Sequence, residues 1–144
     1  WGMRMVNKRE EEYLEAIYIL LMEKNVARVK DLAKILNVKA PTVVEFLEKL
    51  SRKGLVKYEK REPITLTDEG REIAKKVYRR HVLLRDFLSE VLGVPSDLAE
   101  KDACSIEHSI SDETLNKLEK LFEYIKRNPS LLKEIRDFVK SIKA

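Results

Sequence analysis

The chain has 144 residues, of which 44% are hydrophobic and 38% are charged, and its net charge at pH 7 is +4. This length suits one domain or two small ones with a packed core. No apolar run approaches the roughly 20 residues that a membrane-spanning helix needs, and the single cysteine excludes an internal disulfide. We therefore expect no membrane partner, no secretory signal and a cytoplasmic location.

A first helix is expected to begin after Asn7 and to end near Glu23. Asn7 followed three residues later by Glu10 is a capping-box pattern, and apolar residues then recur at helical spacing. Glu12 and Glu15 lie three residues apart and therefore on one helical face. Taken alone, these acids are most simply a solvated face at the positive end of the helix dipole.

The next stretch predicts a winged helix-turn-helix. Asp31–Leu36 has the apolar spacing of a helix, and after a tight turn a second helix starts near Pro41, a residue suited to a first helical turn. Gly54 is expected to end that helix, because glycine is free to take a positive φ. Alternation over residues 55–59 and a return over 64–66 predict a short β-ribbon. In this motif the second helix enters the major groove of DNA.

Charge supports DNA binding. Residues 28–61 hold ten lysines and arginines against four acids, a local charge of +6, whereas the remainder of the chain carries −2. A basic module joined to a slightly acidic one is typical of a DNA-binding protein with a separate sensing domain. The alternative is an ordinary solvated helix pair, but the turn, proline, glycine and ribbon agree with the charge.

Helices are expected throughout the second half of the chain. Thr67 should cap a long helix that reaches Gly93, and further helices are expected over residues 95–108, from Ser111 to Ile125, and over 128–142. The last two carry more apolar surface than a short tail needs. This surplus predicts a helical dimer interface, with a monomeric bundle as the alternative.

Three residues of this half have the spacing of metal ligands. Cys104, Glu107 and His108 are placed i, i+3, i+4, which brings side chains to one face of a continuous helix. Thiolate, carboxylate and imidazole together suit a divalent first-row metal ion. The alternative is a small core cysteine beside a frayed helix end, and the triplet alone does not decide. His81 lies on or beside an apolar stripe, where a histidine is more often an interior residue than a ligand.

The expected fold class is mainly α: an N-terminal winged helix-turn-helix with a small β-ribbon at residues 1–70, then an all-α dimerisation and metal-binding domain at 71–144. Several motifs resemble those of the diphtheria-toxin-repressor and manganese-transport-regulator family of metal-activated repressors. They are EEYLEAIY, ARVKDLAKILNV with PTV, GLV, LTDEGREIA, YRRH and CSIEHSIS. The chain resembles a short form of this family that lacks the third, SH3-like domain.

The resemblance implies a metal-binding set and a cofactor. Cys104 matches the cysteine of iron-type members, whereas Glu12 replaces an aspartate of manganese-type members. Arg85 and Glu100 stand where iron-type members carry an acidic ligand and a histidine. The expected cofactor is Mn(II) or Fe(II), with Co(II) or Zn(II) as further candidates. The implied ligands are Glu12, Glu15, His81, Cys104, Glu107 and His108.

The expected partner is double-stranded operator DNA, bound by a homodimer. The resemblance carries DNA contacts over to Arg28, Pro41 and Thr42. Val44 can touch a thymine methyl group, and Glu45 can accept a hydrogen bond from a cytosine amine. The full expected DNA-binding set is Arg28, Lys39, Pro41, Thr42, Val44, Glu45, Lys49 and Lys60.

The leading hypothesis is a cytoplasmic repressor of metal homeostasis genes that binds DNA when loaded with metal. The ion would offset the repulsion among up to four negative charges and hold the first helix against the dimerisation domain. A winged-helix regulator that senses an organic ligand or redox state through Cys104 is the alternative. A metallohydrolase with Glu107 as base is a third possibility without a supporting motif. We expect the chain not to be an enzyme.

Overall fold

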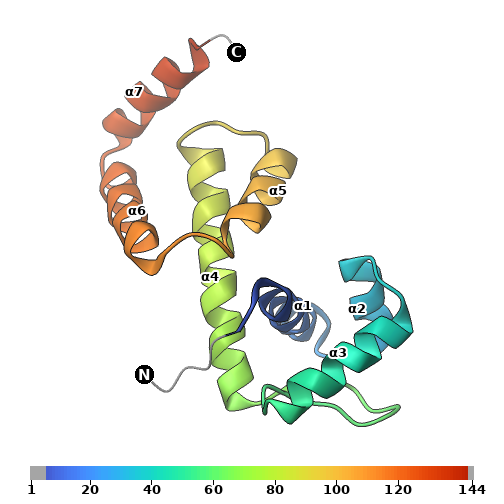
Figure 1. Cartoon of the computed structure of the whole chain (residues 1–144). Helices are drawn as coiled ribbons and strands as arrows, with labels where there is room; N and C mark the ends of the chain where they lie inside the picture. Colours follow the sequence, from blue (N-terminus) through green and yellow to red (C-terminus); the bar gives the residue numbers. More distant parts are fainter. Residues whose placement is uncertain (1–5, 143–144) are drawn as a thin grey trace. The chain divides into compact units, whose positions relative to one another are not determined.

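The computed structural model describes residues 6–142, so the outermost residues of both expected domains lie outside the described part. Two units are present, residues 1–78 and 79–144, and the division falls inside one long helix. The elements of the described residues (Figure 1) are α1 (Lys8–Lys24), α2 (Val29–Leu36), α3 (Ala40–Arg52), β1 (Val56–Lys57), β2 (Thr65–Leu66), α4 (Asp68–Glu90), α5 (Ser96–Ile106), α6 (Asp112–Lys126) and α7 (Pro129–Lys140).

This element order confirms the expected fold class, in which helices dominate and a two-stranded ribbon follows a helix-turn-helix. None of the helices in residues 6–142 is long and apolar enough to cross a membrane.

Helix α1 is closed at both ends by asparagine. The side chain of Asn7 accepts a hydrogen bond from the Glu10 N–H at 2.8 Å, and the Glu10 carboxylate accepts one from the Asn7 N–H at 3.0 Å. This is the expected capping box. At the other end Asn25 takes a left-handed conformation (φ 62°) and its N–H binds the carbonyl of Leu21.

The turn between α2 and α3 is made by Asn37, which is also left-handed (φ 55°). Its N–H contacts the carbonyls at the end of α2, so α2 stops and the chain changes direction. Pro41 lies in the first turn of α3 as expected. Gly54 follows the C-terminus of α3 at φ 75°, which confirms the predicted stop.

The β-ribbon is short, with two residues in each strand. Val56 pairs with Leu66 and Lys57 with Thr65 in an antiparallel register. Between the strands the N–H of Glu62 binds the carbonyl of Glu59 at 3.0 Å, and Arg61 adopts a left-handed conformation at φ 70°. The ribbon therefore turns over a residue that is neither glycine nor asparagine.

One apolar core holds unit 1 together. It takes buried side chains from α1, α2, α3, both strands and the first part of α4, among them Tyr13, Leu32, Leu47 and Ile64. Tyr13 stacks on Phe46 with ring centroids 4.2 Å apart, which joins α1 to α3.

An ion pair between the buried Glu10 of α1 and the partly exposed Lys53, the residue after α3, joins the same two elements. Glu10 is 1% exposed, and the Lys53 ammonium lies 2.5 Å from its carboxylate. Burial alone raises the pKa of Glu10, but the hydrogen bonds from Lys53 and Asn7 outweigh burial and lower that pKa below its usual value. The contacts with Lys53 and Asn7 therefore offset the cost of burying the Glu10 carboxyl group.

We expect Lys53→Met to destabilise the protein by about 2 kcal/mol. Breaking a buried pair costs about 3–5 kcal/mol because one charge stays buried alone, and the partial exposure of Lys53 reduces this figure. Urea unfolding monitored by circular dichroism measures the effect. Arg52→Met, which removes an equal charge from an exposed neighbour, should change stability by less than about 0.5 kcal/mol. Equal effects of the two variants would contradict a structural role for the pair.

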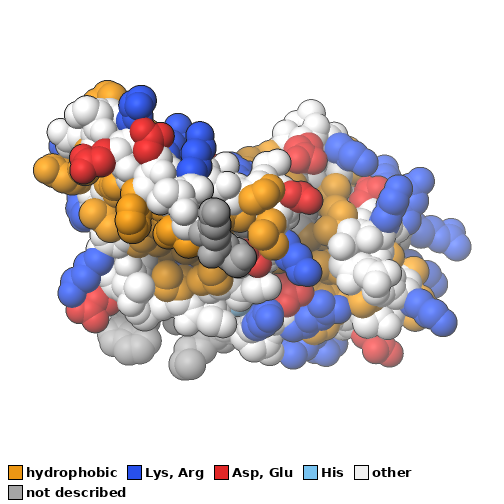
Figure 2. All heavy atoms as spheres, turned by 90° about the horizontal axis from the view of Figure 1, so that it is seen from above, with side chains coloured by type: hydrophobic (Ala, Val, Ile, Leu, Met, Phe, Trp, Pro, Cys, Tyr) orange, Lys and Arg blue, Asp and Glu red, His pale blue; other side chains and the backbone are white. Residues whose placement is uncertain are grey.

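Unit 2 has two smaller apolar clusters. Leu84, Ala103 and Leu115 join α4, α5 and α6, and a second cluster joins α4, α6 and α7, with Phe87 and Phe122 in edge-to-face contact at 5.6 Å. Several large apolar side chains nevertheless face solvent on α6 and α7, and hydrophobic atoms show at the surface in Figure 2. Leu121, Tyr124 and Phe138 are 50%, 54% and 68% exposed.

Candidate metal centre and nucleic-acid interface

Glu107 is the centre of the candidate metal site. It is completely buried at the C-terminus of α5, and neither of its carboxylate oxygens has a hydrogen-bond partner among the described residues. A buried carboxylate without such partners is unfavourable unless a cation compensates its charge. The surroundings of Glu107 therefore indicate what the site holds.

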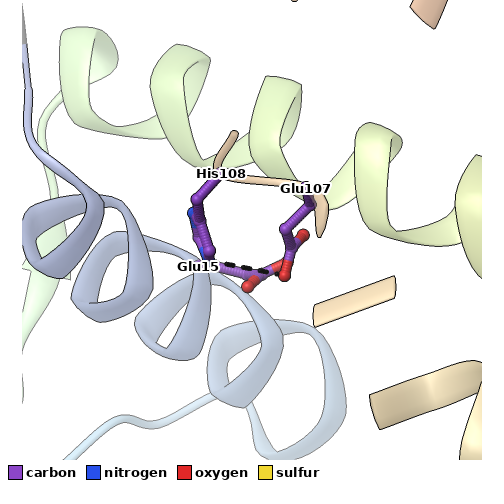
Figure 3. Close-up of side chains that lie close together, drawn as sticks. All are labelled: Glu15, Glu107 and His108. Carbon is purple, nitrogen blue, oxygen red and sulfur yellow. Dashed lines mark ion pairs between the residues drawn. The ribbon is translucent and has the colours of Figure 1, made fainter. Parts of the chain in front are cut away.

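Two imidazoles from the same unit face Glu107. His108 Nε2 lies 3.5 Å from Glu107 Oε1, and Figure 3 shows the two side chains turned toward each other. Nδ1 of His81, on α4, lies 3.4 Å from the same oxygen. One carboxylate and two imidazoles converge here, and this donor set fits a divalent first-row metal ion. Glu15, also labelled in Figure 3, belongs to α1 of unit 1.

His81 contacts a second carboxylate as well. Its Nε2 lies 2.7 Å from Glu100 Oε1, and Arg85 approaches the other oxygen of Glu100 at 3.8 Å. The interaction with Glu107 raises the pKa of His81 to about 9, and Glu100 adds to this effect while burial opposes it. A metal ion bound here would therefore compete with a proton for the imidazole of His81.

Cys104 does not share the environment of the two residues with which its spacing associates it. Helix α5 ends at Ile106, so Glu107 is the capping residue and His108 lies in the following turn. Cys104 is exposed, whereas the side chains of Glu107 and His108 are 0% and 1% exposed. The structure thus brings His81, Glu107 and His108 together and leaves the thiol at the surface of unit 2.

The two acidic candidates of α1 differ in surroundings. Glu15 is 8% exposed. Glu12 is more accessible and forms an ion pair with Arg9 at 3.0 Å, while the Arg9 guanidinium lies 5.5 Å from the centre of the Tyr13 ring. Arg9 was not among the residues expected at the site, although its position three residues before Glu12 signals an i,i+3 ion pair.

The DNA-binding candidates lie on the accessible part of unit 1. Val44 is half-buried and the other seven candidates are exposed, with Pro41, Thr42, Glu45 and Lys49 all on α3. Lysine and arginine side chains are abundant over the side of the molecule that holds α2 and α3 (Figure 2).

A cleft of about 650 Å³ lies beside Val44, lined also by Tyr58, Lys60 and Arg61 of the ribbon. Tyr58 and Arg61 were not among the expected DNA-binding residues. Alternation along the first strand places Tyr58 on the face opposite Lys57, which is the one sequence signal available for it.

A helix-turn-helix with a ribbon, followed by a helical unit that contains a carboxylate–imidazole cluster, defines the class of metal-responsive DNA-binding regulators. Residues 5–63 match the family described as iron dependent repressor, N-terminal DNA binding domain. Residues 67–136 match iron dependent repressor, metal binding and dimerisation domain. The chain belongs to the iron-dependent repressor family, whose members are metal-dependent transcriptional regulators and not enzymes.

The chain is also similar in sequence to individual transcriptional regulators. The chain is 42% identical over 117 residues to an uncharacterised helix-turn-helix transcriptional regulator of Methanocaldococcus jannaschii, covering 81% of this chain and 94% of the relative. It is 35% identical over 130 residues to the regulator MntR of Shouchella clausii, covering 90% of each.

A solved manganese-dependent transcriptional repressor in complex with manganese superposes with a TM-score of 0.73 at 32% identity. The superposition covers 80% of this chain and 53% of the solved one, so the chain spans about half the length of that protein.

Proposed function

We propose that this protein is a cytoplasmic repressor that binds operator DNA as a homodimer when loaded with Mn(II) or Fe(II), and that it controls metal homeostasis genes. The observation that carries the proposal is the buried Glu107 carboxylate, without a hydrogen bond from any described residue and facing His81 and His108. A buried carboxylate without hydrogen bonds is stabilised by a bound cation. The family to which the chain belongs responds to metal ions.

We propose residues 1–70 as the DNA-binding domain and residues 71–144 as the dimerisation and metal-binding domain. The exposed apolar side chains of α6 and α7 support dimerisation, because contiguous apolar surface of this kind is typical of subunit interfaces. The order of the two family matches, residues 5–63 and then 67–136, supports this division.

The proposed ligands come from both parts of the chain. His81, Glu107 and His108 would hold the ion with oxygen and nitrogen donors, a set that accepts divalent first-row ions, and the choice of Mn(II) or Fe(II) rests on the family. The ion supplies a double positive charge that offsets the buried carboxylate. The resemblance adds Cys104, Glu12 and Glu15 to the ligands. Glu12 and Glu15 lie on the first helix, so through them metal binding would affect that helix.

In the DNA-binding domain the chain's own residues read the operator. We propose that the cations hold the phosphate backbone and that exposed residues early in α3 meet the bases, as in other helix-turn-helix proteins. Val44, next to the cleft, would meet a thymine methyl group and Glu45 a cytosine amine. The proposed contacts are Arg28, Lys39, Pro41, Thr42, Val44, Glu45, Lys49 and Lys60.

The alternative reading, an organic-ligand or redox sensor acting through Cys104, finds no support in the two family matches, both of which describe a repressor dependent on iron. A metallohydrolase is likewise outside the family's activities.

Metal-dependent protection of promoter DNA tests the proposal. We expect genomic promoter fragments to be protected in the presence of Mn(II) or Fe(II) under anaerobic conditions, less with Co(II) or Zn(II), and not in chelator. If the dimer covers six to ten phosphates, the logarithm of the affinity should fall with the logarithm of salt concentration at a slope of about −5 to −9. Identical protection in chelator and in all four ions would reject the metal switch.

A further inference from the structure

We infer that Arg80 is a positioning residue of the metal centre: it fixes the backbone that presents Glu107 and His108. This inference rests on the proposed function, since it concerns the same site. It assigns a role to a cation that is not among the proposed ligands.

Arg80 reaches both sides of the segment that joins α5 to α6. Its Nη2 donates to Asp112 Oδ1 at 2.7 Å, in the first turn of α6. Its Nη1 donates to the carbonyl oxygen of Glu107 at 3.4 Å, at the end of α5. The Arg80 side chain is 13% exposed, whereas the Asp112 side chain that it contacts is 55% exposed.

His81, the next residue on α4, contacts the same ligand as Arg80. His81 faces the Glu107 carboxylate, while Arg80 contacts the Glu107 main chain. The carboxylate has no hydrogen bond of its own from a described residue, so its location depends on where the backbone holds it. Arg80 is the described side chain that supplies a hydrogen bond to that backbone carbonyl.

The backbone that carries His108 is a turn that follows the end of α5. The helix stops at Ile106, and the carbonyl of Ile106 then accepts hydrogen bonds from both the Ser109 and Ile110 N–H groups at 2.9 and 3.0 Å. His108 lies in this turn. The hydrogen bond from Arg80 to the Glu107 carbonyl adds a side-chain anchor to this segment, and ligand-orienting contacts of this kind tune metal affinity.

A purely electrostatic role and a positioning role for Arg80 predict opposite changes in metal affinity when Arg80 is replaced. Arg80 carries a positive charge near the site, so its removal would by charge alone strengthen binding of a cation. Loss of an anchor weakens binding, typically about 10- to 100-fold for contacts that orient a ligand. The direction of the change therefore separates the two explanations.

Arg80→Gln is the test variant and Arg79→Gln is its matched control. Arg79 is the preceding residue of α4, carries the same charge and binds Glu119 at 2.5 Å on α6, but has no recorded contact with the α5–α6 connection. Mn(II) affinity is measured by competition with a fluorescent chelator. We expect Arg80→Gln to bind Mn(II) about 10- to 100-fold more weakly than the parent, and Arg79→Gln to bind as tightly as the parent or slightly more tightly.

Hydrogen exchange in the presence of chelator gives a second readout that needs no metal. Amides of residues 108–111 should exchange faster in Arg80→Gln than in the parent and in Arg79→Gln. Should Arg80→Gln fail to fold, Asp112→Asn removes the other end of the same contact at an exposed position and should also accelerate exchange there.

The outcomes distinguish this inference from the proposed function. A parent protein that binds no metal refutes the proposed function. A parent that binds Mn(II), together with an Arg80→Gln variant that binds it equally or more tightly and exchanges at the same rate, refutes the positioning role alone.

Discussion

Glu107→Gln should lower metal-dependent DNA binding by more than about 100-fold, since even the contacts that merely orient metal ligands are worth about 10- to 100-fold. The substitution keeps size and shape but removes the buried negative charge that faces His81 and His108. A neutral amide is a poor ligand for Mn(II) or Fe(II) compared with a carboxylate. The fold should survive, because a neutral side chain is easier to bury than a charge.

The measurement is fluorescence anisotropy of a promoter fragment selected by metal-dependent protection, titrated with Mn(II). Glu113→Gln is the control: it removes the same charge from an 81% exposed side chain on the next helix. This control should respond to Mn(II) as the parent does. A Glu107→Gln protein that responds like its control would show that the sensor lies elsewhere.

Gly70→Ala should destabilise the DNA-binding unit by about 3 kcal/mol or more, at the upper end of the range for overpacking. A β-carbon on Gly70 would lie 1.9 Å from the carbonyl oxygen of Leu55, a backbone atom. That carbonyl cannot move freely, because it accepts a hydrogen bond from the Thr67 N–H at 3.2 Å. Thr67 in turn caps α4 through the Gly70 N–H at 3.0 Å and donates to the carbonyl of Gly54.

Gly93→Ala separates this steric effect from the general loss of a glycine. Gly93 has a positive φ of 69° and nothing within 4 Å of its added carbon, so alanine there should cost about 1 kcal/mol through backbone strain alone. Urea unfolding of both variants gives the comparison. If Gly70→Ala is the milder of the two, the close approach to Leu55 is not present in the protein.

Helix ends were the part of the fold that sequence reasoning predicted best. Asn7, Thr67 and Ser111 cap helices through contacts to residues three positions away, and the structure has all three. Gly54 stops α3 as expected. These outcomes depend on chemistry within one turn of the chain, which the sequence displays directly.

Contacts across long sequence separations were not predictable in the same way. The buried pair of Glu10 and Lys53 joins residues 43 positions apart, and Arg80 meets Asp112 across 32. The sequence does not distinguish a charged residue that faces water from one that pairs with a residue far along the chain. Only the fold decides, and one sequence without its relatives carries no signal of pairing.

The candidate metal site shows the same contrast between local spacing, which a sequence displays, and surroundings, which depend on the fold. Glu107 and His108 were found from their spacing, and the structure places them together. The same spacing assumed that the helix continues through Cys104 to His108. The helix ends at Ile106, and the thiol and the carboxylate have different surroundings, one exposed and one buried.

The left-handed Arg61 at the turn of the ribbon has a consequence for engineering. A side chain at φ 70° costs about 1 kcal/mol relative to glycine. Selection for thermal stability alone would thus favour Arg61→Gly, and the same change would remove a cation from the edge of the cleft beside α3. At this position stability and affinity for a polyanion are in conflict. A screen of variants at the ribbon has to score DNA retention alongside melting temperature, or it will enrich proteins that are robust and inactive.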